Sequence, residues 1–420
     1  MPRFISLAIL LLLTVVSCVT PARAQADAPA TIETITRKLA SAEFAGRAGQ
    51  TDGGRNAGQY LASALRDAGL KPVPNPGQNV AGLLEGTTRK GEFVIVSAHY
   101  DGFGGAFVGA MDNAAGVAVM LDVARLLAKS PPQRSVLFLA LAGGEQGNAG
   151  LKAYAERPLV PLEKTVAVLN LSGFGGGFGD RLHETLYAIG AENVPALAQA
   201  ITKHKRSEAY VALIGDDVTH FLGGEHFHVR LNQLPVVTFT NGVHYAYHTK
   251  ADTVSRINFA ALPKHGATLA KIVAEIANTP GNLERIAQPQ YDADEAAEWS
   301  RLLTALRENV IQTPANNAGL AKLDDALLEL KRFKGVPVQD AKARTAVILR
   351  AASLCFYIAN PNGVEFNSLL SAARNAEQSG NRAQAIAAYQ KLLKFIEDEY
   401  RRDDQTVNDF RAKLMQFRER

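Results

Sequence analysis

The fold is decided by residues 93–128, which read FVIVSAHYDGFGGAFVGAMDNAAGVAVMLDVARLLA. Residues 93–98 form an apolar run interrupted only by Ser97, which is typical of a strand buried on both faces. Residues 114–128 carry apolar side chains at helical spacing, at Val117, Met120, Leu121, Ala124 and Leu127. A second apolar run follows at residues 135–141. The segment therefore predicts a strand, a helix and a second, parallel strand.

The same alternation extends to both sides of this segment. Residues 31–39 and 56–70 have helical patterns, and further buried strands are expected at residues 80–84, 165–171 and 234–239. Strands that alternate with helices favour a three-layer α/β/α sandwich around a mostly parallel mixed sheet. We expect this domain to occupy residues 30–280.

The pattern changes after Thr279-Pro280-Gly281, where residues 281–292 are polar and predict a linker. Residues 293–420 then predict an all-α domain, with helices at 293–310, 318–333, 341–359, 365–379 and 382–400. Small and aromatic residues at Ala373, Gly380, Ala385 and Tyr389 have the spacing of one tetratricopeptide-like hairpin. An ordinary helical hairpin is the alternative. A hairpin of the repeat type would give these helices a protein partner.

The first 24 residues predict a signal peptide. Arg3 precedes an apolar run at residues 4–16, and Ala22-Arg23-Ala24 is a small-x-small cleavage site. The alternative is a lipoprotein signal that ends at Val15-Val16-Ser17-Cys18, which would place a lipid anchor on Cys18. Both interpretations predict an exported protein, either periplasmic or secreted, and the second one attaches it to a membrane.

The overall composition argues against a nucleic-acid partner and against a disulfide bond in the mature chain. The chain has 420 residues, 20% of them charged, and a net charge of +4, which gives no reason to expect nucleic acid as a partner. Cys18 and Cys355 are its two cysteines. Because Cys18 lies in the signal region, we expect no disulfide in the mature chain and a core held together by packing.

Metal-ligating side chains follow several of the predicted strands. His99 comes directly after residues 93–98, and Asp112 stands in the turn before the following helix. Glu145 follows residues 135–141, and His248 follows the last strand. Each one alone has an ordinary explanation, such as a helix cap or a surface carboxylate. Because strand ends meet at one edge of such a sheet, the four together predict a site for zinc or a similar divalent ion.

Four ordered blocks resemble the co-catalytic zinc aminopeptidases, family 28 of the metallopeptidases. The blocks are residues 39–47, 97–101, 109–116 and 248–253, and the resemblance extends over about residues 39–262. It implies that Asp112 bridges two zinc ions, one held with His99 and the other with Glu145 and His248. It further implies that Asp101 orients the His99 ring from outside the ligand shell.

Two positions depart from the family pattern. Gly144 stands where the family carries a glutamate as general base, and Ser172 stands where it carries an aspartate ligand. We therefore assign no catalytic base. Residues 215–230 offer replacements: Asp216, Asp217 or Glu225 as a base, and His220, His226 or His228 as ligands. Surface or packed histidines are the alternative explanation for the last three.

The departures at Gly144 and Ser172 determine which function we expect. We expect one zinc at Asp112, Glu145 and His248, with a second ion as an option, in a hydrolase-family protein that acts on or binds peptide N-termini. Loss of a general base costs about 10²–10⁴ in rate, so hydrolysis is expected to be impaired. One alternative is a non-catalytic protein that binds peptides or acts as a scaffold through its helical tail. The other is a single-zinc transferase of the glutaminyl-cyclase type.

Overall fold

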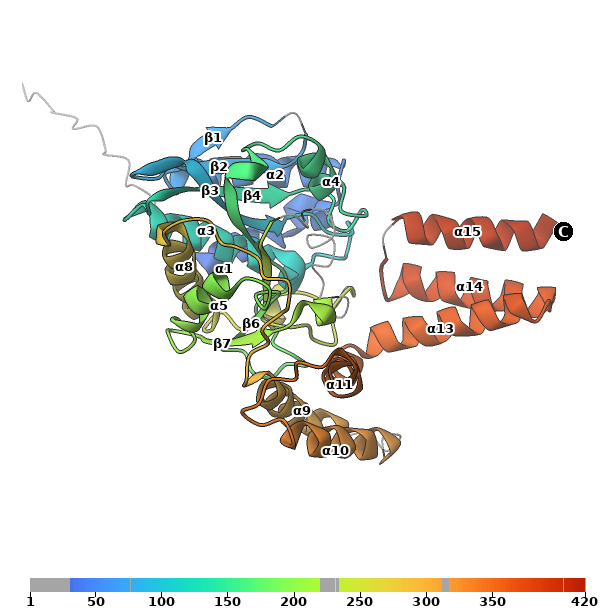
Figure 1. Ribbon diagram of the computed structural model, residues 1–420. Helices are drawn as coiled ribbons and strands as arrows, with labels where there is room; N and C mark the ends of the chain where they lie inside the picture. The colour runs from blue at the N-terminus through green and yellow to red at the C-terminus, as the bar shows by residue number, and fades with distance from the viewer. Residues whose placement is uncertain are drawn as a thin grey trace, which may run out of the picture. The chain divides into compact units, whose positions relative to one another are not determined.

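A computed structural model describes residues 31–75, 77–219, 231, 234–311, 317–402 and 404–419 (Figure 1). The expected signal peptide at residues 1–24, with Cys18, lies outside these residues. So do His220, Glu225, His226 and His228.

The centre of the fold is a mixed sheet of eight strands in the order β1-β2-β4-β3-β5-β8-β6-β7. Its middle four strands, β4, β3, β5 and β8, run parallel, while β1, β2 and β6 pair antiparallel to their inner neighbours. The strands are β1 Lys71–Val73, β2 Val80–Leu84, β3 Arg89–His99, β4 Arg134–Leu141, β5 Thr165–Leu171, β6 Thr185–Ile189, β7 Tyr210–Ile214 and β8 Val236–Thr240. The expectation of a mostly parallel mixed sheet is confirmed.

The register of the parallel strands places the candidate ligands at one edge. His99 at the end of β3 pairs with Leu141 at the end of β4, three residues before Gly144. On the other side, Ser97 of β3 pairs with Asn170 of β5. The turns that follow these strands therefore emerge next to one another, as the strand-end argument requires.

Helices cover both faces of the sheet, because successive strand residues point to opposite sides. Val94, Val96 and Ala98 belong to a core formed with helices on the first face. Ile95 and Leu137 face the other way and pack with α4 (Ala149–Glu156). The helices of the first face are α1 Ile32–Leu39, α2 Asp52–Asp67, α3 Ala115–Ala128, α5 Pro195–Thr202 and α8 Leu262–Asn278.

The helices after residue 290 share part of their core with the sheet. Tyr187 and Ile189 of β6 are buried together with Trp299 and Leu302. These contacts come from α9 (Glu295–Ile311), α10 (Asn317–Lys331) and α12 (Arg350–Ala359), while α11 (Ala341–Arg344) leads into α12. The three-layer sandwich is confirmed, with a helical C-terminal region. Its division into domains at residues 281–292 stays a prediction.

The last three helices have a core of their own. They are α13 (Pro361–Gln378), α14 (Arg382–Asp398) and α15 (Asp404–Glu419), and α13 and α14 form a hairpin. Ala373, Ala385 and Tyr389 are buried in it, and Gly380 turns the chain with a φ of 71°. The tetratricopeptide interpretation stays a prediction. Among the described helices, none is both long and apolar enough to cross a membrane.

A buried charged cluster joins the helical region to the strand ends. The Arg344 guanidinium forms ion pairs with Glu295 and with Asp217, the latter at 2.6 Å. Next to it, Glu192 Oε1 accepts the backbone N–H of Asp216 at 3.1 Å, while Glu192 Oε2 has no partner among the described residues. Asp217, one of the candidate replacement bases, is thus engaged by Arg344.

Replacing Glu192 with glutamine is expected to make the protein more stable at alkaline pH. Burial, followed by repulsion from Asp216, raises the pKa of Glu192 from 4.5 to about 9. A raised pKa favours the protonated carboxyl in the folded state, so the stability that it contributes is complete below about pH 4.5 and is lost as the pH rises towards 9. Glutamine remains neutral and removes this loss.

Thermal melting at several pH values tests this. We expect the Tm of Glu192→Gln to exceed that of the wild type by at least about 2 °C near pH 9, and the difference to shrink towards pH 5. The matched control is Glu33→Gln, since the Glu33 side chain is 47% exposed. A difference that is equal at all pH values would contradict the assignment.

Candidate metal centre

The site is built around the Asp112 carboxylate, whose two oxygens face different histidines. Asp112 Oδ1 lies 3.1 Å from His99 Nε2, and Asp112 Oδ2 lies 3.2 Å from His248 Nε2. Asp112 belongs to the short helical turn Ala110–Ala114 that leads into α3. One carboxylate thus stands between two imidazoles that come from distant parts of the chain.

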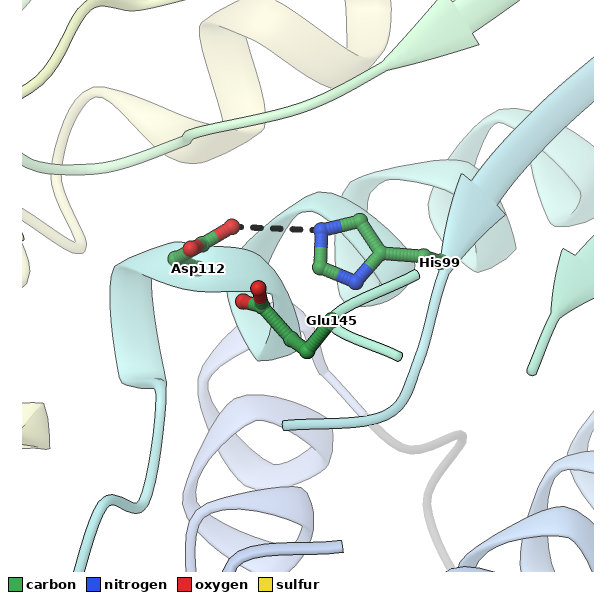
Figure 2. A group of neighbouring side chains, drawn as sticks. All are labelled: His99, Asp112 and Glu145. Carbon is green, nitrogen blue, oxygen red and sulfur yellow. Dashed lines mark hydrogen bonds and ion pairs between the residues drawn. The ribbon is translucent and has the colours of Figure 1, made fainter. Parts of the chain in front are cut away.

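Glu145 completes the group from the turn after β4. Its Oε2 lies 3.7 Å from His248 Nε2, and one ligand atom each from His99, Asp112 and Glu145 falls within 4.8 Å of the others (Figure 2). The side chains are 18% exposed for His99 and 10% or less for Asp112, Glu145 and His248. The structure therefore brings together all four metal ligands that the sequence predicts.

The spacing and chemistry of these donors fit a zinc ion. Ligand atoms about 2.1 Å from a tetrahedral zinc lie roughly 3.4 Å from one another. The distances from His248 Nε2 to Asp112 and Glu145, 3.2 and 3.7 Å, bracket that value. These three ligands enclose a space of about 10 Å³ together with Gly102, Phe103 and Phe107. These three side chains could therefore hold a single zinc ion and leave open the fourth position that a catalytic zinc needs.

The buried carboxylates at the site would also be stabilised by a cation. Burial, followed by repulsion from Asp112, raises the pKa of Glu145 well above its usual range. Burial alone would raise the pKa of Asp112 as well, but His248 and His99 hold it below its usual range. For His99, burial acts to lower the pKa, yet Asp101 and Asp112 raise it well above 6.5. A bound dication would relieve the repulsion between these carboxylates.

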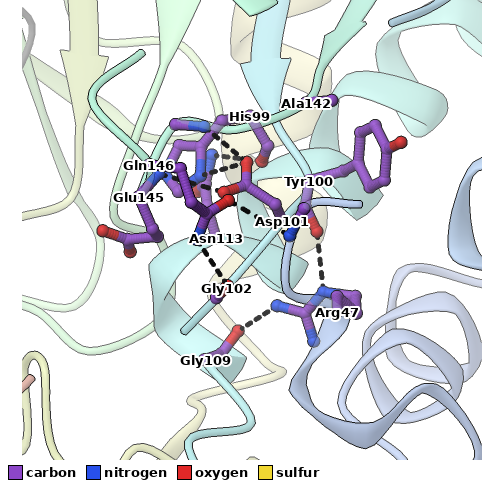
Figure 3. A network of polar contacts seen from close by, with 12 residues as sticks. Arg47, His99, Tyr100, Asp101, Gly102, Gly109, Asn113, Ala142, Glu145 and Gln146 are labelled. Carbon is purple, nitrogen blue, oxygen red and sulfur yellow. Dashed lines mark hydrogen bonds and ion pairs between the residues drawn. The ribbon is translucent and has the colours of Figure 1, made fainter. Parts of the chain in front are cut away.

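Asp101 holds the turn that carries Glu145. Its two oxygens accept the backbone N–H groups of Gly144 and Glu145 at 2.7 and 3.0 Å (Figure 3). Asp101 Oδ1 is 3.6 Å from His99 Nδ1, which is longer than an ordinary hydrogen bond. The contact of Asp101 with the His99 ring is therefore weaker than expected. Its stronger contacts are the two hydrogen bonds that position Glu145.

Two further residues organise the site and were not recognised from the sequence as doing so. The buried guanidinium of Arg47 donates to the backbone carbonyls of Leu39, Tyr100, Val108 and Gly109. The Asp252 carboxylate accepts the N–H groups of Met111 and Asp112 at 2.9 and 3.1 Å. Arg47 lies in the sequence block at 39–47 and Asp252 in the block at 248–253, and this position in the blocks was the available signal that they support the site.

Residues 79–273 match the model of peptidase family M28. Residues 79–273 belong to this family. The curated relatives include a probable zinc metalloprotease of Pyrenophora teres f. teres (strain 0-1), 32% identical over 103 residues, which are 23% of this chain and 22% of the relative. Endoplasmic reticulum metallopeptidase 1 of Mus musculus is 26% identical over 214 residues, 48% of this chain and 22% of that protein.

The aligned stretches span only a small part of these relatives. The matches cover 22% to 30% of the length of the first three curated proteins, all named probable zinc metalloproteases. Zinc is the metal that this family implies. Among solved structures, LapB from Legionella pneumophila aligns with a TM-score of 0.50 at 19% identity, covering 60% of this chain and 73% of LapB, which shows a common fold.

The M28 domain has no room for a side chain at position 144. A Cβ atom on Gly144 would lie 2.7 Å from Cγ and 2.8 Å from Nδ1 of the His99 ring. The His99 imidazole thus occupies the space into which a residue at this position would project. Substituting glutamate for Gly144 would therefore displace a predicted metal ligand rather than simply add a base.

Ser172 follows the end of β5, directly beyond the strand residue Leu171. Asn113 connects this strand end to β3, because its Nδ2 donates to the carbonyls of Leu171 and His99 at 2.9 and 3.3 Å. Ser172 therefore lies at the same edge of the sheet as the candidate ligands, and its side chain is a neutral hydroxyl. On the His99 side of Asp112, the two expected ligands His99 and Asp112 are present. The third, a carboxylate, is missing because Ser172 takes its position.

Proposed function

We propose that this protein is an exported zinc-dependent member of peptidase family M28 that acts on or binds peptide N-termini and hydrolyses them slowly. Its zinc is held by Asp112, Glu145 and His248. The observation that carries the proposal is the Asp112 carboxylate, which has a complete ligand set on its His248 side and an incomplete one on its His99 side.

The protein's own residues account for binding better than for catalysis. When bound, zinc polarises a carbonyl oxygen and activates water. Hydrolysis also needs a group that accepts a proton from that water. Gly144 offers none, and a side chain added there would collide with the His99 ring. Asp217 is engaged by Arg344. Slow turnover follows from a site that holds the metal but lacks this partner.

The space around the ligands limits what can approach. Phe103 and Phe107 line the pocket of about 10 Å³, which is roughly the room that one water molecule needs. Phe103 and Phe107 would therefore contact whatever group a bound peptide presents to the metal.

Metal analysis combined with peptidase assays tests the proposal. We expect the purified wild-type protein to retain about one zinc per chain, and His248→Ala to retain much less. Hydrolysis of aminoacyl anilides by the zinc-loaded wild type is expected to be about 10²–10⁴-fold slower than that of an aminopeptidase with an intact base. The control is His204→Ala, because His204 lies away from the ligand set and faces Glu275.

Each other outcome selects a different function. Two tightly held ions and ordinary turnover would contradict the proposal and point to a replacement base, with Asp216 and Glu225 as the first candidates. Peptide binding with no turnover would identify a non-catalytic binding protein. Cyclisation of peptides with N-terminal glutamine, included in the same assay, would identify the transferase alternative.

A further inference from the structure

The segment that carries His248 is attached to the C-terminal helices by backbone contacts. The N–H of Arg401 donates to the carbonyl of His248 at 2.9 Å, and Thr249 forms an antiparallel bridge with Tyr400. Arg401 and Tyr400 belong to residues 399–402, here called the clamp loop, which follows α14. Residues more than 150 positions apart in the sequence thus form a small piece of β-structure beside the metal ligands.

Two side-chain hydrogen bonds strengthen this attachment. Lys250 Nζ donates to the carbonyl of Asp398, the last residue of α14, at 2.6 Å. Asn362 Nδ2, in the first turn of α13, donates to the carbonyl of Tyr245 at 2.7 Å. The C-terminal helices therefore contact the His248 segment on both sides of the ligand.

His248 has a backbone conformation that its surroundings must maintain. Its φ is 61°, in the left-handed region that residues other than glycine rarely adopt. Such a conformation persists only where neighbouring contacts hold it in place. The hydrogen bond from Arg401 to the His248 carbonyl is a contact of this kind.

The imidazole of His248 is also packed by the clamp loop. The Tyr400 ring centroid lies 5.7 Å from that of His248, and the Phe103 ring packs edge-on at 4.8 Å. Tyr400 is 1% exposed. Neighbours that lock the orientation of a ligand usually change metal affinity when they are removed.

We infer that the clamp loop is a positioning element of the metal centre, through which the C-terminal helices set zinc affinity. The inference rests on the proposed zinc site. The Arg401 amide fixes the backbone of His248, and the Tyr400 ring fixes its imidazole, so that Nε2 points towards Asp112 and Glu145. Binding free energies are reciprocal, so zinc in turn stabilises the contact between the clamp loop and the His248 segment.

Two pairs of variants in the full-length protein test this. Arg401→Pro removes the amide donor, whereas Arg401→Ala removes the same side chain and keeps the amide. Tyr400→Ala removes the ring that packs on His248, and Tyr400→Phe retains it. We expect the first member of each pair to bind zinc about 10-fold more weakly than the second in competition with a chelator.

Hydrogen exchange of the wild-type protein gives an independent test. Zinc is expected to slow exchange in the peptide that contains the clamp loop, and His248→Ala is expected to remove this effect. Circular dichroism of the zinc-free variants checks their folding. If a variant does not fold, the comparison of exchange in the wild-type protein with and without zinc still tests the inference.

Failure of the inference and failure of the proposed function give different results. Equal zinc affinities within both pairs, or clamp-loop exchange that zinc does not change, would overturn the inference while the zinc site stands. A wild-type protein that binds no zinc in the competition assay would instead overturn the proposed function.

Discussion

Asp112→Asn is expected to weaken zinc binding by more than about 100-fold, beyond the 10–100-fold that is typical for residues outside the ligand shell. Asparagine has nearly the same shape as aspartate but no negative charge. Its amide cannot reproduce a carboxylate whose oxygens lie 3.1 and 3.2 Å from two histidine nitrogens. The change therefore affects both sides of the site at once, and a cation loses its central counter-charge.

Competition with a chelator measures the effect directly. Asp122→Asn is the matched control, because Asp122 lies on the following helix α3 and pairs with Arg125. We expect the control to change zinc affinity by less than about twofold, because Asp122 is not one of the candidate ligands. Zinc affinity that is the same in Asp112→Asn and Asp122→Asn would show that the metal binds elsewhere.

Arg47→Met is expected to lower the free energy of unfolding by about 3–5 kcal/mol, which is the typical cost of breaking a buried charged network. The Arg47 side chain donates to four backbone carbonyls, from residues 39, 100, 108 and 109. Methionine fills similar space but donates no hydrogen bond, so these buried acceptors lose their partner. Since residues 100–109 connect His99 to the turn of Asp112, zinc affinity is expected to fall as well.

Urea denaturation of the zinc-free protein separates the two effects, because metal binding itself stabilises the fold. Arg37→Met serves as the control: the Arg37 side chain is 52% exposed, and its ion pair with Glu33 should contribute less than about 1 kcal/mol. If both variants unfold at the same urea concentration as the wild type, Arg47 does not organise the site.

The local pattern of the sequence was enough for the central part of the fold. Continuous apolar runs predicted β2, β3, β4 and β5 closely, because strands buried on both faces have no polar alternation. The short β1 and the strands β6 and β7 were not predicted. β1 is short and mostly exposed, so its apolar signal is weak. β6 and β7 are short, largely buried runs, and their apolar residues were an available signal. Helix α15 was missed because its sequence is mostly polar.

The ligand set could also be predicted, since parallel strands bring their ends to one edge whatever the details of packing. His99, Asp112, Glu145 and His248 lie together as expected. Their supporting contacts could not be predicted in the same way. Arg47 reaches carbonyls as far as 62 residues away, and no periodic pattern marks a side chain that bonds to backbone atoms.

The sequence by itself was enough to predict the family, the sheet and four candidate metal ligands, because these depend on strand pattern and on residues at strand ends. The tertiary structure alone decided that the His99 ring fills the space beside Gly144 and that the clamp loop contacts His248. Both depend on where side chains and distant segments meet in space. Such contacts arise from packing between elements, and the order of residues within any one element does not encode them.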